Sequence, residues 1–582
     1  MKIDPVMVEL VTNSLVRCCE EMRVTVERTA YSTIISETVD FSCALLDTDK
    51  NLVAEASGIP VFLANLSEAV SEVDRIIGFE NLEEGDVVFC NDPYSGGFSH
   101  NPDVTVIAPV FYEGHLVLFS AFKGHILDLG GIYAGGWYNN TVETYQEGVM
   151  FPPVKLYIRG APNEDIIRVI RRNSRLPEAL LGDIRAMVSA VRVGGERAKT
   201  LIKKYGKEVF FGCVGQTLEI SEAIARKAVE AIPDGVYSGH YYSDGGGDDT
   251  KPLSDRLMVK MTITVDGDRL VVDLTGSSPQ CAGPTNCPRP TTVSQIRYGF
   301  KALTTPFMPS NEGCFRPLEI IIPEASIFDP LMPTATSLLW APSVSLPDLM
   351  LKLVTSQAPD KARAGHFGDV CADFLYGTDP RTGRFYIYAE PTAGGWGAKP
   401  YEDGETMFCY ADGNTYSMPV EVLEVKYPVR VLRYGLSPDT GGPGRYRGGL
   451  GIFRDYSPVG HTMRTTVTFD RRKYSPAWGV FGGKEGYPNK VVVLRNGSSE
   501  EYGKITDLEV HSGEVISLRG GGGGGYGDPM ERDPRAVAWD VLNGYISLEA
   551  ARREYGVVLD PSSLEVDEGE TAVLRGPGKG AK

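Results

Sequence analysis

The stretch that most constrains the fold is residues 90–131, CNDPYSGGFSHNPDVTVIAPVFYEGHLVLFSAFKGHILDLGG. Two apolar stretches, TVIAPVF and LVLFSAF, flank a short glycine turn and predict an antiparallel hairpin. In a hairpin, the residue before the first strand lies beside the residue after the second. The turn SHNPD precedes the first strand and KGHILD follows the second, so we expect these two segments to meet at the open end of the hairpin.

Three of the seven histidines fall in this stretch. The hairpin brings His125, and with it the neighbourhood of Asp128, next to His100 and Asp103. Two imidazoles and a carboxylate at one end of a sheet are typical ligands of a divalent first-row metal that keeps open positions. The plainer alternative is that SHNPD is only a turn closed by an aspartate hydrogen bond. We expect His115, at the far turn, to be solvated.

The amino-acid composition limits the classes of protein to which the chain can belong. A chain of 582 residues should hold several domains. Its 66 glycines favour many short strands and turns. A net charge of −18 argues against nucleic acid and anionic membranes as partners. The N-terminus lacks the pattern of a secretory signal, and no apolar run approaches the ~20 residues that span a bilayer. Ten cysteines without a C-x-x-C motif predict buried free thiols of a cytoplasmic protein.

The expected fold class is α+β, in a large multi-domain chain with a β-rich body and glycine-rich turns. Helical spacing of apolar residues predicts a helix over 5–29. Two short C-terminal helices should begin at Asp533 and Ser547. The expected division is an N-terminal α+β region with the metal site (1–162), a helical segment (163–231), a β-rich region (232–510), and a glycine-rich loop with C-terminal helices (511–582).

Several motifs leave their function open. The run LRGGGGGGYGDP contains G-x-G-x-x-G trivially, but no dinucleotide-binding βαβ unit surrounds it. No Walker-type ATP motif occurs. TGGPGRYRGGLG could wrap a phosphate with Arg445 and Arg447, or could be a glycine-rich β corner. SDGGGDD offers calcium ligands by composition, but its spacing fits no EF-hand and favours a flexible turn at the tip of a hairpin. The residues alone therefore indicate a metal-dependent enzyme subunit.

Ordered segments from end to end carry a family resemblance. They include ERTAYSTIISETVDFSCALLD, NDPYSGGFSHNPDVTVIAPVF, NEGCFRPLEIIIP, GGPGRYRGGLG and GGGGGYGDPMERDPRAV. These segments resemble the hydantoinase B family, the B-type subunits of ATP-dependent hydantoinases and 5-oxoprolinases. ATP-dependent lactamases and the biotin-independent acetone and acetophenone carboxylases are similar to the same family.

The resemblance implies a mechanism shared between two subunits. An A-type partner with an actin-like fold would hold ATP and Mg²⁺ and phosphorylate the carbonyl or enolate oxygen of the substrate. The family's metal ligands carry over onto His100, Asp103 and His125, which would bind Zn²⁺ or Mn²⁺. Metal-activated water would then open a phosphorylated cyclic amide. Asp128 or Glu143 would act as a base or support the ligands. The expected assembly is a hetero-tetramer or larger.

Three functions stay open: a hydrolase of a hydantoin, 5-oxoproline or a lactam, a subunit of an ATP-dependent ketone carboxylase, and a non-catalytic subunit that stabilises its partner. The family often has a histidine where this chain reads SGIPVFLANLS. The residues present there, Gly58 and Phe62, predict a more apolar pocket, which favours a lactam or a ketone. Earlier in the chain, Arg28, Glu37 and Asp40 could face a pocket, although their spacing favours a surface ion-pair set.

Overall fold

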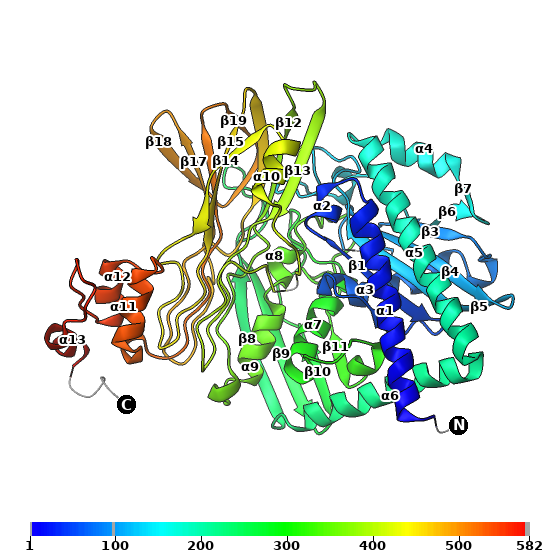
Figure 1. Cartoon of the computed structure of the whole chain (residues 1–582), viewed down its shortest axis with the longest axis horizontal. Coiled ribbons are helices and arrows are strands. Elements are labelled where there is room, and N and C mark those ends of the chain that lie inside the picture. The colour runs from blue at the N-terminus through cyan, green and yellow to red at the C-terminus, as the bar shows by residue number, and fades with distance from the viewer. Residues whose placement is uncertain (1–2, 96–98, 412, 577–582) are drawn as a thin grey trace.

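The computed structural model describes residues 3–95, 99–411 and 413–576, which form four β-sheets with helices packed around them (Figure 1). The strands of the N-terminal sheet are β1 (Phe41–Asp47), β2 (Leu52–Glu55), β3 (Val87–Cys90), β4 (Asp103–Tyr112), β5 (His115–His125), β6 (Val154–Ile158) and β7 (Ala161–Pro162). They are hydrogen-bonded in the order β2-β1-β5-β4-β3-β6-β7. The predicted hairpin is confirmed as β4 and β5, which are antiparallel neighbours.

Helices cover both faces of this sheet. On one face lie α1 (Pro5–Thr29) and α5 (Pro177–Tyr205), and on the other lies α3 (Pro60–Ile76). Along β4, Val106 belongs to the core shared with α1 and α5, whereas the next residue, Ile107, belongs to the core shared with α3. Successive side chains of a strand point to opposite faces, so a strand covered on both sides is apolar throughout. That explains the unbroken apolar stretch TVIAPVF.

The predicted helical segment and the first helix are both confirmed. Residues 163–231 hold α4 (Glu164–Arg172), α5 and α6 (Lys207–Glu230), and the helix expected over 5–29 is α1. The short helix α2 (Thr33–Ser36) leads from α1 into β1. The expected domain boundaries stay a prediction.

The other three sheets form the β-rich body. Their strands are β8 (Gly235–Ser243), β9 (Leu257–Asp266), β10 (Arg269–Asp273) and β11 (Leu318–Ile321); β12 (Ala372–Thr378), β13 (Phe385–Pro391), β16 (Thr462–Thr468) and β19 (Lys504–His511); and β14 (Val429–Leu436), β15 (Ile452–Pro458), β17 (Lys490–Arg495), β18 (Ser498–Tyr502) and β20 (Val515–Arg519). Between them lie α7 (Arg289–Thr304), α8 (Trp340–Ser343), α9 (Leu346–Val354) and α10 (Val420–Lys426).

The glycine run 520–525 is the centre of a bundle of extended segments. A Cβ atom on these glycines would collide with backbone atoms of four neighbouring segments: Ala393 and Trp396 for Gly520 and Gly523, Thr440 and Pro443 for Gly522 and Gly525, Tyr487 for Gly521, and Trp478 for Gly524. The repeat of three residues is that of a polyproline II helix. Figure 1 shows these segments running side by side beyond the sheets, in yellow and orange. The run therefore serves close backbone packing.

The chain ends in three short helices, α11 (Pro534–Leu542), α12 (Leu548–Tyr555) and α13 (Glu568–Arg575). The predicted starts are confirmed, because the side chains of Asp533 and Ser547 accept backbone hydrogen bonds and cap α11 and α12. The sequence interpretation missed α13. None of the ten cysteines forms a disulfide, and nine are buried. None of the helices in the described part of the chain has the length and apolarity to cross a membrane.

Candidate metal centre

The hairpin sets the positions of the three candidate ligands. Asp103 is the first residue of β4 and His125 is the last residue of β5, and the two are directly paired in the sheet register. The turn before β4 is closed by a hydrogen bond of 2.9 Å from the Asp103 amide to the His100 carbonyl. This turn carries the His100 side chain back over the end of the hairpin. The structure thus brings together the residues that the sequence predicted to meet.

The three ligand atoms form a nearly equilateral triangle. His100 Nε2 lies 3.2 Å from Asp103 Oδ1 and 3.3 Å from His125 Nδ1, and His125 Nδ1 lies 3.1 Å from Asp103 Oδ1. For an ion about 2.1 Å from each ligand, a tetrahedral edge is about 3.4 Å and an octahedral edge is about 3.0 Å. The observed separations fall between these two values. Among the described residues, this is the one group of three metal-ligating side chains whose ligand atoms all lie within 4.8 Å of one another.

Neighbouring groups orient these ligands. His100 Nδ1 contacts the Ser337 carbonyl at 3.0 Å, and since that oxygen can only accept, the proton of the neutral ring lies on Nδ1 and Nε2 offers its lone pair. The buried carboxylate of Glu147 accepts the Ser337 amide at 3.0 Å and so fixes the loop that holds this carbonyl. Ser99 Oγ donates to Asp103 Oδ2. Hydrogen bonds to the atoms that face away from the triangle therefore fix the orientation of His100 and Asp103.

Burial and charge act together on this group. Burial by itself raises the pKa of Asp103, but the attraction of His100 and hydrogen bonds from both histidines hold the pKa of that carboxyl far below its usual range. Burial lowers the pKa of His125, and Asp103 does not compensate fully. Burial also lowers the pKa of His100, but the attraction and hydrogen bond of Asp103, together with the Ser337 carbonyl and the charge of Glu147, outweigh burial and raise that pKa. The donor set of two imidazole nitrogens and one carboxylate oxygen fits a divalent ion. His125 Nε2, the ring nitrogen that is not part of the triangle, is buried without a hydrogen-bond partner among the described residues.

The ligands open onto a small cavity of about 50 Å³. Its walls are largely apolar and aromatic. The ring of His125 lies 5.1 Å from that of Trp137, and His100 meets the edge of Trp340 at 6.1 Å. The lining residues are Asp40, Ile59, Val61, Phe62, Ser99, His100, Asp103, His125, Trp137, Leu339, Trp340, Val370, Pro391 and Tyr410.

The other predicted site residues lie elsewhere. Asp128 does not line this cavity; its buried carboxylate pairs with Arg175 at 2.7 Å. Glu143 is exposed and caps a short 3₁₀ turn, so it does not reach the ligands. His115 is exposed, as expected. Outside the triangle, the described carboxylate that lines the cavity is that of Asp40. This residue directly precedes β1, the strand paired with β5.

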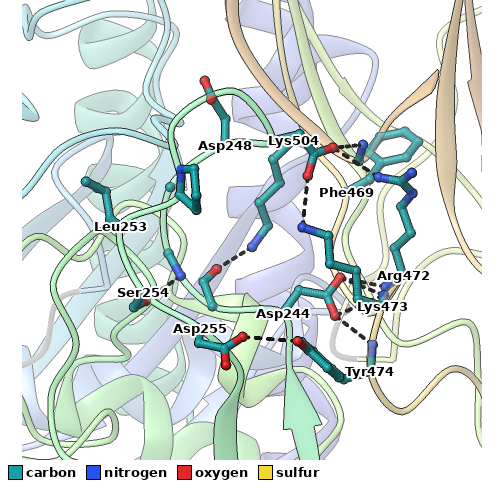
Figure 2. Close-up of a pocket in the computed structure, with 16 residues that line it drawn as sticks. Asp244, Asp248, Leu253, Ser254, Asp255, Phe469, Arg472, Lys473, Tyr474 and Lys504 are labelled. Carbon is teal, nitrogen blue, oxygen red and sulfur yellow. Dashed lines mark hydrogen bonds and ion pairs between the residues drawn. The ribbon is translucent and has the colours of Figure 1, made fainter. Parts of the chain in front are cut away.

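A second, larger cavity of about 410 Å³ lies around the acidic segment 243–249 (Figure 2). The segment is not the tip of the β9–β10 hairpin: it begins the loop that joins the antiparallel strands β8 and β9, and its carboxylates accept hydrogen bonds from the chain. Asp244 accepts backbone amides of residues 472–474, and Asp249 pairs with Arg472 at 3.0 Å. Lys504 crosses the cavity to the Gly245 carbonyl at 2.7 Å. These charges already have partners in the chain.

The glycine-rich segment with Arg445 and Arg447 packs against other segments of the chain, and the groups around Arg447 show this directly. Arg447 is buried, donates to the Gly448 carbonyl at 2.7 Å, and lies 3.5 Å from the carboxylate of Asp540. Its segment packs against the glycine run, where Gly523 donates to the Gly449 carbonyl. The arrangement supports the alternative of a glycine-rich corner and leaves the Arg447 guanidinium committed within the chain.

The fold and the site together define the class: an α+β protein with a candidate metal site of two histidines and one aspartate at the end of a buried hairpin. Comparison with known proteins gives the family. The chain belongs to the hydantoinase B/oxoprolinase family, whose model matches residues 4–529. It is 32% identical to the B-type subunit of a putative D-/L-hydantoinase of Pseudomonas sp. (strain NS671), over 99% of this chain and 98% of that one.

Solved structures agree with this assignment. The ATP-dependent caprolactamase from Pseudomonas jessenii is similar with a TM-score of 0.92 and 29% identity, over 99% of this chain and 100% of that one. A nucleotide-free acetone carboxylase is similar with a TM-score of 0.90 over 98% of this chain and 82% of that one. At 19% identity the second likeness shows the fold alone. The resemblance found in the sequence is thus confirmed.

Proposed function

We propose that this chain is the B-type component of an ATP-dependent cyclic-amide hydrolase, and that it works with an A-type partner that binds ATP and Mg²⁺. The observation that carries the proposal is the His100, Asp103 and His125 triangle, with metal-compatible spacing inside an apolar cavity. Relatives described as a B-type hydantoinase component and an ATP-dependent caprolactamase support the substrate class. We expect a cytoplasmic complex, a hetero-tetramer or larger.

The three ligands would hold Zn²⁺ or Mn²⁺, since imidazole and carboxylate serve both ions. Such an ion lowers the pKa of a bound water toward neutrality, which makes a nucleophile available near pH 7. The chain does the rest of the positioning. Ser337 keeps the lone pair of His100 directed inward. Trp137 and Trp340 exclude bulk water from the reacting carbon, which strengthens electrostatic interactions inside the site.

Asp40 is the proposed proton acceptor, in place of Asp128 and Glu143, because it is the carboxylate outside the triangle that lines the cavity. In the overall reaction, one water adds to the activated carbonyl carbon and the ring C–N bond breaks; the ring nitrogen takes up the protons of that water, which leaves an amine and an acyl phosphate. A second water hydrolyses the acyl phosphate to a carboxylate, and the phosphoryl group that came from ATP leaves as inorganic phosphate. Asp40 would accept the proton of the attacking water and return it to the ring nitrogen.

The second candidate is a component of an ATP-dependent ketone carboxylase. It is favoured by the fold shared with acetone carboxylase and by the apolar walls of the cavity, which suit a small ketone. The two functions differ in what ATP turnover requires. A hydrolase needs only water and a cyclic amide, whereas a carboxylase needs bicarbonate and a ketone.

The test is reconstitution of the chain with its ATP-binding partner. ADP and product release are measured with a panel of lactams, hydantoins, 5-oxoproline and ketones, with and without bicarbonate, and bound metal is measured by mass spectrometry. We expect bicarbonate-independent ring opening and one divalent ion per chain. His125→Ala should remove both, while Glu143→Gln, an exposed matched control, should keep both. Ring opening that survives His125→Ala would support the non-catalytic alternative.

A further inference from the structure

Residues 530–576, called here the C-terminal unit, form a small group of helices at one end of the molecule. Figure 1 shows α11, α12 and α13 in red, beyond the bundle of extended segments. The unit has an apolar core of its own, separate from the main core; its buried residues are Val537, Ile546, Ala550, Ala551, Tyr555, Val557 and Leu559. Arg532 pairs with Asp403 at 2.6 Å and with Asp540 at 2.8 Å, so ion pairs fix the unit on the body of the protein.

This unit exposes large apolar side chains to solvent. Trp539 and Leu542 are 54% and 68% exposed, and a spacing of three residues along α11 puts them on one face of that helix. Val573, on α13, is 81% exposed. Leu548 and Leu574 are exposed as well. So many exposed apolar side chains in so small a unit favour a contact with another protein, and tryptophan is among the residue types that contribute most to such contacts.

Relatives differ in whether they match this part of the chain. The family model ends at residue 529, directly before the unit. The caprolactamase subunit beta of Pseudomonas jessenii matches 98% of this chain over 99% of its own length. The 5-oxoprolinases of Dictyostelium discoideum and Arabidopsis thaliana are longer polypeptides, of which this chain matches 40% and 42%, and each matches 90% of this chain. The unmatched share corresponds in length to residues 530–582.

The physical difference between these relatives is covalent linkage. In the longer polypeptides, the rest of the protein is joined to the part that matches this chain, which keeps it at an effective concentration in the millimolar range. Separate chains must obtain all of their affinity from the surfaces that touch. A contact between two copies of this chain would be needed equally in both arrangements. A contact with the other component of the enzyme is needed most where the components are separate.

We propose that the C-terminal unit is the docking element for the ATP-binding partner, and that Trp539 and Leu542 are the centre of this contact. The inference rests on the proposed function, which supplies the partner, and it adds the surface that the partner binds. The surface that fits on the partner is an apolar groove that accepts one face of a helix, with the side chains of Trp539 and Leu542 as anchors.

The experiment measures the affinity of the full chain for the purified ATP-binding subunit by titration calorimetry. Leu542→Lys and Trp539→Ala should each weaken binding about 30-fold or more, the effect of losing a residue at the centre of an interface. The matched control is Phe307→Lys, which adds the same charge at a side chain that is 99% exposed in the loop after α7, and it should bind as the wild type does. Thermal unfolding establishes that each variant is folded. Wild-type affinity in both α11 variants would overturn the inference.

A fused protein separates docking from an effect on the site. The ATP-binding subunit is joined by a long flexible linker to the N-terminus of this chain, and ATP turnover is compared with and without Leu542→Lys. With separate subunits at low concentration, the substitution should lower turnover in proportion to the complex that is lost. In the fused protein it should leave turnover unchanged, because the linker replaces the lost affinity. Equal losses in the fused and the separate proteins would contradict the docking role.

The inference can fail separately from the proposed function. If the complex depends on α11 but opens no cyclic amide, the proposed function fails and the docking surface stands. If cyclic amides are opened and both α11 variants bind the partner normally, the docking surface alone fails. Light scattering of the chain without its partner tests the other occupant. A dimer that Leu542→Lys dissociates, with the affinity for the partner unchanged, would assign this face to a second copy of the chain and refute the inference.

Discussion

A single added methyl group in the glycine run should disrupt the bundle that this run centres. A Cβ atom on Gly523 would lie 1.9 Å from the Trp396 carbonyl oxygen, and contacts under 3.0 Å are essentially never observed. The two backbones must separate by about 1.1 Å, the difference between these distances. Gly523 also donates to Gly449 at 2.9 Å and accepts from Gly442 at 2.8 Å, and a displacement of that size along either bond would stretch it beyond 3.5 Å.

The expected cost follows from these contacts. Two backbone hydrogen bonds are worth about 1 kcal/mol each, and overpacking adds about 1–3 kcal/mol, so Gly523→Ala should lower the free energy of unfolding by about 3–5 kcal/mol. Differential scanning calorimetry should show a Tm lower by roughly 3–4 °C for cooperative unfolding of the whole chain. The control is Gly215→Ala in the middle of α6, where a Cβ meets nothing within 4 Å. It should stabilise by about 0.5–1 kcal/mol. A Gly523→Ala protein as stable as the wild type would refute the packing argument.

Three further outcomes test the site. Asp40→Asn should lower kcat by about 10²–10⁴-fold with metal content unchanged, since it would remove a proton acceptor and no ligand; loss of the metal instead would make Asp40 a ligand. Glu147→Gln should weaken metal affinity about 10–100-fold, measured by competition with a chelator, because Glu147 fixes the Ser337 loop behind His100. Removal of the metal by a chelator should lower the Tm, and His125→Ala should abolish that shift, because a ligand of the native state stabilises it by mass action.

The triangle of His100, Asp103 and His125 could be predicted from the sequence because its geometry is local. Two apolar strands, a glycine turn and a proline turn set the register of one hairpin, and that register alone places Asp103 opposite His125. Helix α1 and the caps at Asp533 and Ser547 were predictable for the same reason, since each depends on residues one or two turns apart. Helix α13, eight residues long and capped by Asp567, lies near the lower limit of what such patterns reveal.

The rest of the site depends on contacts between distant segments. Asp40 reaches the cavity because β1 pairs with β5, and Trp340 reaches it from more than 200 residues further along the chain. From the sequence, Asp128 was an equally good candidate for a base beside the ligands, but its carboxylate forms an ion pair with Arg175. No local pattern encodes these pairings, because they depend on which surfaces pack together.

The amino-acid sequence by itself determined the hairpin, its three candidate ligands and the family, because these follow from strand periodicity, turn chemistry and motifs in a fixed order. Only the tertiary structure decided what surrounds them. It placed Asp40 and Trp340 in the lining of the cavity, and it made the glycine run the centre of a bundle. Both results arise from long-range packing, in which a residue's role depends on the neighbour that the fold brings to it.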